Sequence, residues 1–360
     1  MSKRIRLSLI FVAVLFFLFP ALTQTIKKTA FAKDFNAATS SEIVMEASSR
    51  RVLSGSNFHE KKYMASTTKI LTAIVIIENC DLNEIVTVGD KTVGVEGSSI
   101  YLEKGEKLSV KDLLYGLMLR SGNDCAETLA VHCSGSIDKF AALMNETAAK
   151  IGATESNFVN PHGLHDDNHY TTAFDLALIS CYAINNPAFK EIVSTQKTVI
   201  PFTTHDTKRV LINKNKMLKE FEGANGIKTG FTKKAGRCLV SSCERNGMTL
   251  VSVVLNCGPM FERSKTILQN AFDAYKMYDL IESDNIIDFI PMENSDLKCG
   301  VYIKEDVVLP LKESERENLE IVYELPETVK IGTPKDAEIG LIKIYSKNNL
   351  IFTEKIYTIV

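Results

Sequence analysis

Several catalytic signatures are absent from this 360-residue chain. It has no C-x-x-C pair, which argues against a zinc ribbon or a redox motif of that kind. It has no G-x-S-x-G, G-x-G-x-x-G or P-loop pattern, so a hydrolase nucleophile elbow and a nucleotide site are disfavoured. Internal repeats and low-complexity tracts are missing too. What remains is one large or two ordinary globular domains, with 45% apolar residues to form the core.

The apolar segment at the N-terminus is short for a membrane span. A basic stretch with Lys3, Arg4 and Arg6 precedes an apolar run from Leu9 to Leu22, and Ala30-Phe31-Ala32 follows as a small-x-small cleavage site. This order is typical of a secretory signal peptide, which we predict over residues 1–32. An uncleaved anchor is the alternative, because the apolar run ends far before Ala30.

A strong excess of positive charge is also lacking. The formal net charge is −2, and removal of residues 1–32 takes away five positive charges and no acidic residue, which leaves −7. This balance argues against a nucleic-acid partner and favours an exported, extracytoplasmic protein of the cell envelope, secreted or membrane-associated. The eight cysteines lie within apolar patterns without paired spacing. Export permits disulfides, but this placement favours buried free thiols.

Hydrophobic periodicity predicts strands on either side of a helical middle. An N-terminal hairpin is expected over 38–65, and strands at 237–244 and 248–257 flank Asn246-Gly247, a strong hairpin signal. Ser66 opens a helix that is apolar nearly all round and therefore buried. Further helices are expected over 109–119, 136–152, 172–182 and 261–276. We expect both hairpins in one antiparallel sheet flanked by helices, an α/β (α+β) domain over 38–277.

Past Leu280 the helical pattern ends. Short β-rich runs occur at 301–303, 307–309, 319–325, 329–331, 339–345 and 350–360, separated by residues typical of turns. This predicts a small all-β domain over 283–360, without helices.

Three short motifs, in one order along the chain, carry most of the chemical information: Ser66-Thr67-Thr68-Lys69, Ser121-Gly122-Asn123 and Lys228-Thr229-Gly230. S-x-x-K, S-D-N and K-T-G together are the signature of β-lactamases and penicillin-binding proteins, and here the middle motif is S-G-N. Single matches are weak, because S-x-x-K also occurs at Ser136, Ser194 and Ser295, and a literal S-D-N at 283–285 follows the K-T-G motif. The ordered set carries the weight.

Ser66 and Lys69 would supply a nucleophile and a base without histidine. One helical turn apart, the two side chains are within reach of each other. Burial disfavours the charged form of a lysine, so a neutral Lys69 could accept the Ser66 hydroxyl proton. The Ser66 N–H, at a helix N-terminus, would face an oxyanion. For this motif taken alone, the alternative is a serine N-cap beside a surface lysine.

The other two motifs would complete an acyl-transfer site. From a tight loop between helices, Ser121 and Asn123 can both face a cleft, although a helix C-cap followed by a new N-cap explains this motif equally well. Alternation along a strand points Lys228 and Gly230 to one face. Gly230 leaves room for a substrate backbone, and Lys228 and Thr229 can hold a carboxylate. A surface strand is the alternative here.

A metal site is the rival interpretation, and it depends on a histidine-rich segment. Residues 162–169 contain three histidines and two aspartates, a set able to bind a metal. The segment follows Pro161 and is loop-like, without the helical spacing of H-E-x-x-H, so we prefer a structured loop over the cleft. We expect neither a metal nor another cofactor.

Four longer stretches resemble the serine D-alanyl-D-alanine carboxypeptidases, the low-molecular-mass penicillin-binding proteins: Ala65-Ser66-Thr67-Thr68-Lys69, Leu119-Arg120-Ser121-Gly122-Asn123-Asp124, Asn160-Pro161-His162-Gly163-Leu164 and Gly226-Ile227-Lys228-Thr229-Gly230-Phe231-Thr232. The resemblance covers 38–277, and the β-rich tail is similar to that family's accessory domain. It implies a serine β-lactamase/transpeptidase-like fold. It also implies hydrolysis of the D-Ala-D-Ala bond of peptidoglycan stem pentapeptides through an acyl-enzyme on Ser66.

The same resemblance implies a role for each site residue. Lys69 would be the base, Ser121 the proton relay to the leaving D-alanine, and Asn123 the group that orients Lys69 and the substrate. Lys228 and Thr229, beside Gly230, would bind the terminal carboxylate. The N–H groups of Ser66 and Phe231 would form the oxyanion hole, and β-lactams would trap the enzyme at Ser66.

The sequence differs from the family pattern in two places, and two alternative functions remain to be considered. Many members end in an amphipathic helix that rests on the membrane, whereas the pattern here ends in a strand at Val360, so peripheral membrane association is uncertain. Lys214 stands where relatives often carry Arg, and no carboxylate role is carried over to it. A β-lactamase of class A needs a glutamate in an E-x-x-L-N setting, which is not found between Ser121 and Lys228. A non-enzymatic penicillin-binding wall protein is the other alternative.

Overall fold

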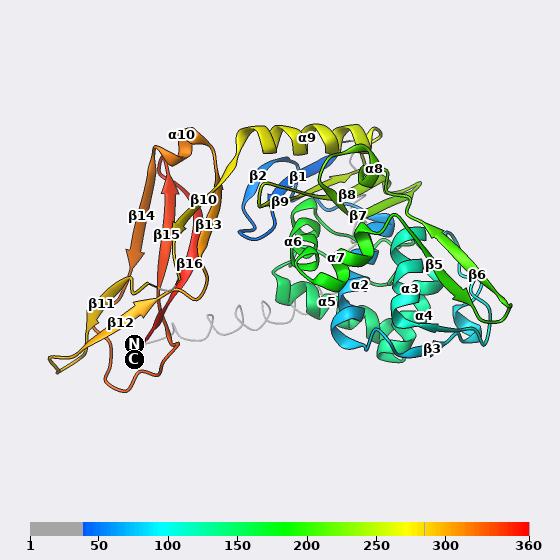
Figure 1. The fold of residues 1–360 in the computed structure, drawn as a ribbon, viewed down its shortest axis with the longest axis horizontal. Coiled ribbons are helices and arrows are strands. Elements are labelled where there is room, and N and C mark those ends of the chain that lie inside the picture. Colours follow the sequence, from blue (N-terminus) through cyan, green and yellow to red (C-terminus); the bar gives the residue numbers. More distant parts are fainter. Residues whose placement is uncertain (1–38, 284, 360) are drawn as a thin grey trace, which may run out of the picture. The chain divides into compact units, whose positions relative to one another are not determined.

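The computed structural model describes residues 39–283 and 285–359, and the predicted signal peptide lies outside them. An antiparallel sheet with helices is followed along the chain by a second group of strands (Figure 1). This confirms the predicted fold class, an α+β domain followed by an all-β part. Over the described residues, no helix combines the length and the apolar character needed to cross a membrane.

The central sheet has the order β2-β1-β9-β8-β7, and all neighbouring strands are antiparallel. Its strands are β1 (Ser41–Glu46), β2 (Val52–Ser56), β7 (Ala224–Thr232), β8 (Gly236–Arg245) and β9 (Met248–Leu255). The N-terminal and late hairpins therefore share one sheet, as predicted. Asn246 and Gly247 both have positive φ, 50° and 77°, as a two-residue hairpin turn requires.

Helices pack on both faces of this sheet because its strands carry apolar side chains on both faces. Ile43 and Met45 of β1 belong to one core with α2 (Lys69–Asn79) and α6 (Ala173–Ile184). Val44, between them, belongs to a second core with α9 (Met260–Ala274). The period of two along the strand thus supplies both layers.

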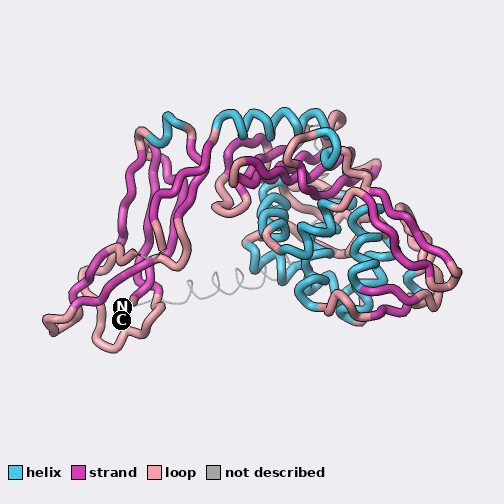
Figure 2. Tube along the Cα trace, in the orientation of Figure 1, coloured by secondary structure: helices cyan, strands magenta, loops and turns pink. Residues whose placement is uncertain are grey.

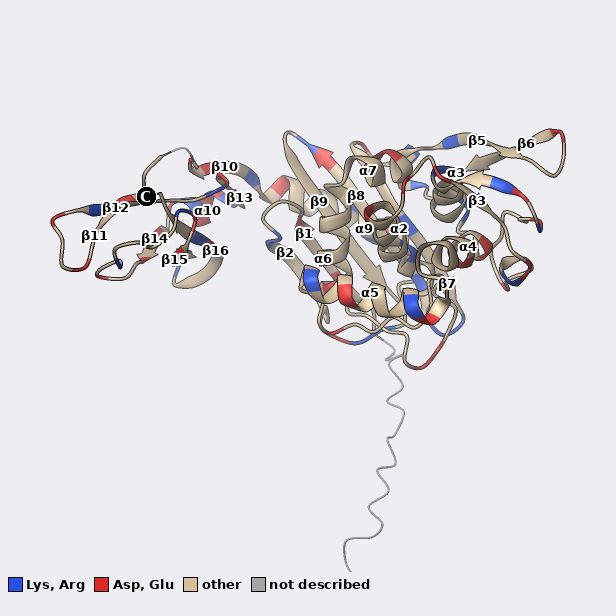
Figure 3. Cartoon of the chain, turned by 90° about the horizontal axis from the view of Figure 1, so that it is seen from below, with Lys and Arg blue, Asp and Glu red and all other residues tan. Residues whose placement is uncertain are grey.

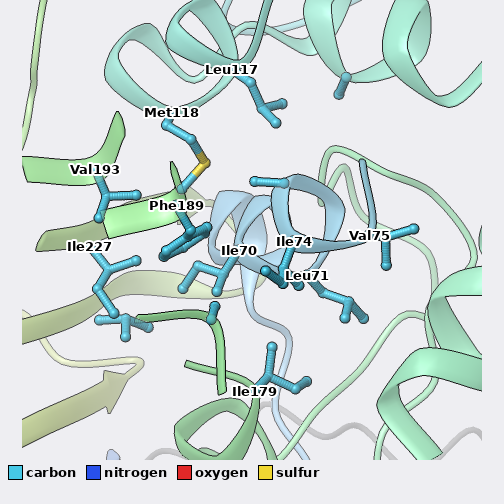
Figure 4. Packing of buried hydrophobic residues seen from close by; sticks show 14 of the residues in the cluster. Ile70, Leu71, Ile74, Val75, Leu117, Met118, Ile179, Phe189, Val193 and Ile227 are labelled. Atoms are coloured by element: carbon cyan, nitrogen blue, oxygen red, sulfur yellow. The ribbon is translucent and has the colours of Figure 1, made fainter. Parts of the chain in front are cut away.

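Helix α2 is the buried centre of the larger core. Ile70, Leu71, Ile74 and Val75 are fully buried and are surrounded by apolar side chains from several other elements (Figure 4). The sequence predicted this, because the segment is apolar nearly all round. Its first residue, Lys69, is consequently buried as well.

The predicted helix caps are present. Ser109 forms a capping box with Asp112, Ser136 caps the next long helix, and the Thr172 side chain accepts from the N–H of Asp175. The remaining helices are α3 (Val110–Tyr115), α4 (Asn123–Ser134), α5 (Ile137–Ile151), α7 (Pro187–Ser194) and α8 (Met217–Glu220).

Two predicted helices differ in their detail. The helix expected from Ser66 begins with a 3-10 turn, η1 (Ala65–Thr68), so Ser66 precedes the α-helix proper. The helix expected to reach Leu119 leaves α geometry after Tyr115 and continues as a π-helical turn, η3 (Gly116–Arg120). Both irregular turns lie next to site motifs, as wider or tighter turns often do at functional sites.

Several small elements were not predicted. Two short antiparallel pairs, β3 (Ile85–Thr87) with β4 (Lys107–Ser109) and β5 (Lys197–Phe202) with β6 (Thr207–Ile212), lie outside the central sheet, and η2 (Asp90–Thr92) is a short 3-10 turn. Figure 2 shows the β5–β6 pair as two magenta strands at the outer edge of the helical region.

The C-terminal strands form a separate core around residues such as Val301, Leu309 and Ile342. Their sheets have the orders β11-β12-β16-β15-β14 and β10-β13. The strands are β10 (Lys276–Ile281), β11 (Asp288–Pro291), β12 (Lys298–Tyr302), β13 (Val307–Leu311), β14 (Leu319–Glu324), β15 (Glu338–Ser346) and β16 (Asn349–Thr358). In this region and in the rest of the chain, acidic and basic residues are interspersed (Figure 3).

Three expectations for this region were wrong. A one-turn helix, α10 (Glu313–Arg316), occurs where none was predicted. The run 329–331 forms no strand, because Val329 makes only an isolated bridge to Met292. Lys276 begins β10 instead of ending the preceding helix, which stops at Ala274.

Candidate active site

Ser66 is the accessible residue of an otherwise buried turn. The other residues of η1 are buried, while Ser66 is partly exposed. The Thr67 hydroxyl donates to the Met64 carbonyl (2.6 Å), and the Thr68 hydroxyl donates to the Ala65 carbonyl (2.9 Å). Side chains of the S-x-x-K motif therefore hold the turn that presents Ser66.

Lys69 lies against Ser66 and two other polar groups. Its Nζ is 3.2 Å from Ser66 Oγ, 2.7 Å from Asn123 Oδ1 and 2.6 Å from the carbonyl oxygen of His162. The Asn123 amide is oriented by its Nδ2, which donates to the Glu96 carbonyl at 2.5 Å. Because that carbonyl can only accept, Asn123 must turn Oδ1 toward Lys69.

The surroundings of Lys69 favour a neutral amine. Burial, followed by the nearby Lys228, lowers the pKa of Lys69 well below its usual value. A neutral amine has two N–H donors and one lone pair. The Asn123 Oδ1 and the His162 carbonyl are acceptors, so they take the two donors. The lone pair then faces Ser66 Oγ, the orientation that general-base catalysis requires.

Ser121 is held in a strained position with an unsatisfied hydroxyl. It follows the π-helical turn η3 and adopts a left-handed conformation with φ of 67°. Its side chain is buried, and within the described part of the chain its Oγ has no hydrogen-bond partner. The loop between helices was predicted, and Asn123, two residues on, opens α4 and contacts Lys69. A free hydroxyl in this place is available to a ligand.

Strand β7 passes directly beside the Ser66 turn. A Cβ at Gly230 would lie 3.0 Å from the Met64 carbonyl oxygen and 3.1 Å from the Ser66 nitrogen, which is tighter than side chains normally pack. Gly230 and Lys228 are both buried on this strand, as the alternation predicted. The glycine allows the close approach of strand and turn.

Lys228 is a buried amine at the same place. Its Nζ donates to the carbonyl of Thr229 at 2.9 Å, and Thr229 itself is partly exposed. Burial, together with the nearby Lys214, lowers the pKa of Lys228 to about 7. Phe231, three residues after Lys228, exposes 62% of its surface, and its ring lies 5.7 Å from the Arg237 guanidinium.

The histidine-rich segment packs on the Ser66 turn. His169 Nδ1 accepts from the Val159 N–H (3.1 Å), so its Nε2 carries the proton and donates to Thr68 Oγ1 (2.8 Å). Burial lowers the pKa of His169 to about 4, and it lowers the pKa of His162 to about 3. Both rings are therefore neutral at pH 7. Across the described residues, no group of three or more His, Cys, Asp or Glu side chains is arranged to hold a metal.

Gly163 makes this packing possible. It has φ of +86°, and a Cβ there would lie 1.9 Å from the Ala65 carbonyl oxygen. The backbone of 160–164 thus touches the turn that carries Ser66. The sequence missed one partner of Lys69, the His162 carbonyl, because a backbone acceptor leaves no trace in the residue pattern.

The other S-x-x-K matches have structural roles elsewhere. Ser136 is the N-cap of α5, Ser194 ends α7, and Ser295 lies in a turn of the C-terminal strands. Lys214 is close enough to Lys228 and Lys69 to lower the pKa of both, and its own pKa is lowered by burial and by Arg120. It adds a third amine to the electrostatics of the site.

Comparison with known proteins gives consistent results. A family model described as D-alanyl-D-alanine carboxypeptidase matches residues 26–258, and one described as penicillin-binding protein 5, C-terminal domain, matches 275–359. D-alanyl-D-alanine carboxypeptidase DacF of Bacillus subtilis is 28% identical over 92% of this chain and 89% of that protein. D-alanyl-D-alanine carboxypeptidase DacA of Haemophilus influenzae is 30% identical over 79% of this chain and 75% of that protein.

The solved structures agree with the sequence relatives. The crystal structure of penicillin binding protein 5 from Haemophilus influenzae has a TM-score of 0.77 and 26% identity, covering 89% of this chain and 96% of that chain. The match therefore includes the central sheet with its helices and the C-terminal strands. The chain belongs to the D-alanyl-D-alanine carboxypeptidase family, the penicillin-binding serine peptidases.

Proposed function

We propose that this protein hydrolyses the terminal D-Ala-D-Ala bond of peptidoglycan stem pentapeptides and releases D-alanine through an acyl-enzyme on Ser66. The observation that carries the proposal is the contact of Lys69 Nζ with Ser66 Oγ at 3.2 Å, with both amine protons held by Asn123 and His162. This geometry supports a serine nucleophile activated by a neutral lysine.

In the acylation step, Lys69 takes the Ser66 proton as Oγ attacks the carbonyl carbon between the two D-alanines. The developing oxyanion accepts hydrogen bonds from the N–H groups of Ser66 and Phe231. The closeness of β7 to the Ser66 nitrogen at Gly230 supports this pairing of donors. The C–N bond then breaks, and the amine of the leaving D-alanine takes up a proton.

Ser121 relays that proton, and the K-T-G strand holds the leaving group. The unpartnered Ser121 hydroxyl can accept a proton from Lys69 and donate its own to the leaving amine. Lys228 and Thr229 bind the terminal carboxylate, which turns the buried Lys228 amine into the partner of an anion. Water then hydrolyses the ester, with Lys69 again as base, and the shortened peptide leaves.

The same Ser66 ester explains inhibition by β-lactams, which we propose as covalent inhibitors. We further propose that residues 1–32 direct export, that 38–277 form the catalytic domain, and that 283–360 form a β-rich accessory domain. The enzyme would then act outside the cytoplasmic membrane, where peptidoglycan lies, and would trim the cell wall and thereby influence cell shape. The family match favours this function over a β-lactamase or a non-enzymatic wall protein.

The test is D-alanine release from a diacylated tripeptide ending in D-Ala-D-Ala, measured with a D-amino-acid oxidase assay. We expect Ser66→Ala to abolish release and to lose the covalent adduct with a fluorescent penicillin. Ser295→Ala, in an S-x-x-K match within the C-terminal strands, should keep both. Unchanged release by Ser66→Ala, or loss of activity on adding a chelator, would contradict the serine mechanism. Steady turnover of the penicillin would favour a β-lactamase instead.

A further inference from the structure

Helices α2 and α4 both begin at the active site, and each has a cysteine at or next to its C-terminal end. Lys69 is the first residue of α2 and Asn123 the first of α4, and the two side chains touch there. Cys80 is the C-cap of α2, and Cys133 is the last residue but one of α4. At 1.5 Å per residue, each cysteine lies about 15 Å along its helix from the site. The helices pack together, and they run in the same direction because both begin at the Lys69–Asn123 contact and both end near the His132–Glu84 contact.

The far ends of the two helices meet at these cysteines. The side chains of Cys80 and Cys133 both pack against the apolar core that contains α2 and α4, and they are close enough to interact with each other. Next to them, His132 Nε2 of α4 lies 3.2 Å from Glu84 Oε2, four residues after Cys80. Both cysteines are partly exposed, whereas the chain's other six are buried. Cys80 and Cys133 therefore lie where the far ends of the two helices of the site come together.

We propose that Cys80 and Cys133 are a redox-active dithiol that forms a reversible disulfide across the far ends of α2 and α4. The pair needs little movement to react, because both thiols lie at the adjacent far ends of the packed helices α2 and α4. It is also accessible to a small reagent, unlike the buried cysteines. An exported protein would meet oxidising conditions in which such a bond persists. The inference stands apart from the proposed peptidase reaction.

The oxidant would be a small-molecule disulfide, and the reaction is two thiol–disulfide exchanges. The Cys133 thiolate attacks one sulfur of the reagent, whose S–S bond breaks and releases a first thiolate. Cys80 then loses its proton and attacks the Cys133 sulfur of the mixed disulfide, releasing a second thiolate. The protein is oxidised by two electrons, the reagent is reduced to two thiols, and the two protons from the cysteines end on those thiols.

The chemistry assigns the order of attack. Hydrogen bonds from Cys80 and from Ser134 lower the pKa of Cys133, which favours the thiolate form of this cysteine. The hydrogen bond with Cys133 and burial raise the pKa of Cys80. Cys133 is therefore the first nucleophile, and Cys80 resolves the mixed disulfide.

The consequence for the enzyme is a covalent tie opposite its active site. The bond would close the loop from Cys80 to Cys133, which includes Ser121 and Asn123, and would fix α4 against the helix that carries Lys69. Cross-linking a loop of this length restricts the unfolded chain strongly. We expect the melting temperature of the native enzyme to rise by about 5–10 °C on oxidation.

The experiment exposes the purified full chain to oxidised glutathione and then counts free thiols under denaturing conditions. We expect the number to fall from eight to six, with a peptide map joining the Cys80 and Cys133 fragments. Cys80→Ser and Cys133→Ser should abolish both the bond and the rise in melting temperature. Cys299→Ser, in the C-terminal strands, should retain both.

Three outcomes would overturn the proposal. One is a full count of eight thiols after treatment. Another is a bond that maps to a different pair of cysteines. The third is a stable glutathione adduct on Cys133 without loss of the Cys80 thiol, which would mean that the two sulfurs cannot reach bonding geometry. Because the wild-type protein itself is mapped, a variant that fails to fold would not hide any of these results.

Discussion

Replacing Ser121 with alanine should make the protein more stable and nearly inactive. The Ser121 hydroxyl is buried and unpartnered in the described structure. Burying such a group without a hydrogen bond costs about 1–3 kcal/mol, and the alanine removes that group while keeping the backbone as it is. Part of the gain is offset by the small space left behind. We therefore expect the free energy of unfolding to rise by about 1 kcal/mol.

The effect on catalysis should be opposite and larger. A positioned general acid–base group typically contributes about 10²–10⁴-fold to rate. We expect kcat/KM for D-alanine release to fall at least about 100-fold, which corresponds to about 2.7 kcal/mol of transition-state stabilisation. Urea denaturation and the coupled D-alanine assay, applied to the same preparation, measure the two changes together.

Ser264→Ala is the matched control. Ser264 is also buried, and its hydroxyl likewise has no partner among the described residues, but it lies in α9 on the other face of the sheet. It should show a similar gain in stability with unchanged activity. The reasoning would be refuted if Ser121→Ala lost stability and activity together, because that pattern indicates a structural hydroxyl. Full activity in Ser121→Ala would refute the relay.

Three further predictions follow from the surroundings of Ser66. In Gly163→Ala the new Cβ would lie 1.9 Å from the Ala65 carbonyl oxygen, so this variant should lose several kcal/mol of unfolding free energy and have a reduced kcat. Gly152 has a similar positive φ but open space around it, so Gly152→Ala should lose only about 1 kcal/mol. Urea denaturation measures both losses. The pKa of Lys228 is about 7 in the folded protein against an ordinary 10.5, so between pH 10.5 and 7 the amine is protonated in the unfolded chain but not in the folded one. The stability of the fold therefore falls as the pH drops from 10.5 to 7. Lys228→Met should therefore be more stable than the parent at pH 7.5 but not at pH 10, with kcat/KM reduced at both; an advantage that stays constant with pH would argue against a buried neutral amine. The pKa of His169 is about 4 in the folded protein against an ordinary 6.5, so its contribution to stability falls as the pH drops from 6.5 to 4. In denaturation experiments, His169→Gln should reduce the slope of stability against pH in this range by up to about 1.4 kcal/mol per pH unit. An unchanged slope would contradict a neutral buried ring.

The elements that the sequence predicted well are those set by local signals. The hairpin at Asn246-Gly247 and the caps at Ser109, Ser136 and Thr172 depend on residues within four positions of each other. The β5–β6 hairpin was missed because its connection, 203–206, lacks glycine and an Asn-Gly pair. Pro201 within β5 also weakens the local strand signal, because proline is found in sheets mainly on edge strands. The π-helical turn at 116–120 depends on packing and has no local signal.

The candidate site was predictable as a set of residue types but not as a network. The three motifs identified Ser66, Lys69, Asn123 and Lys228, and the structure brings the first three into contact. What the sequence could not supply is the third partner of Lys69, the His162 carbonyl, because it comes from the backbone. The histidines of that segment attracted a metal hypothesis, yet His169 acts as a neutral hydrogen-bond donor to Thr68. The motifs located these side chains in the sequence, whereas the pKa shifts of Lys69 and His169 come from their burial in the fold.

Burial of Lys69 explains why the most apolar helix of the chain also carries the proposed base. A lysine on a half-exposed helix would keep its proton at neutral pH, and it could not then accept one from Ser66. The start of helix α2 is instead enclosed on all sides, because Ile70, Leu71 and Ile74, which point in different directions around the helix, are all fully buried. Each such side chain stabilises the fold by about 1.5–3 kcal/mol, which offsets the cost of desolvating an amine at the end of the same helix. Ile74→Ala should therefore loosen the core and raise the pKa of Lys69 together, moving the acidic limb of the pH–rate profile to higher pH. An unchanged limb in a destabilised variant would separate the core from the chemistry.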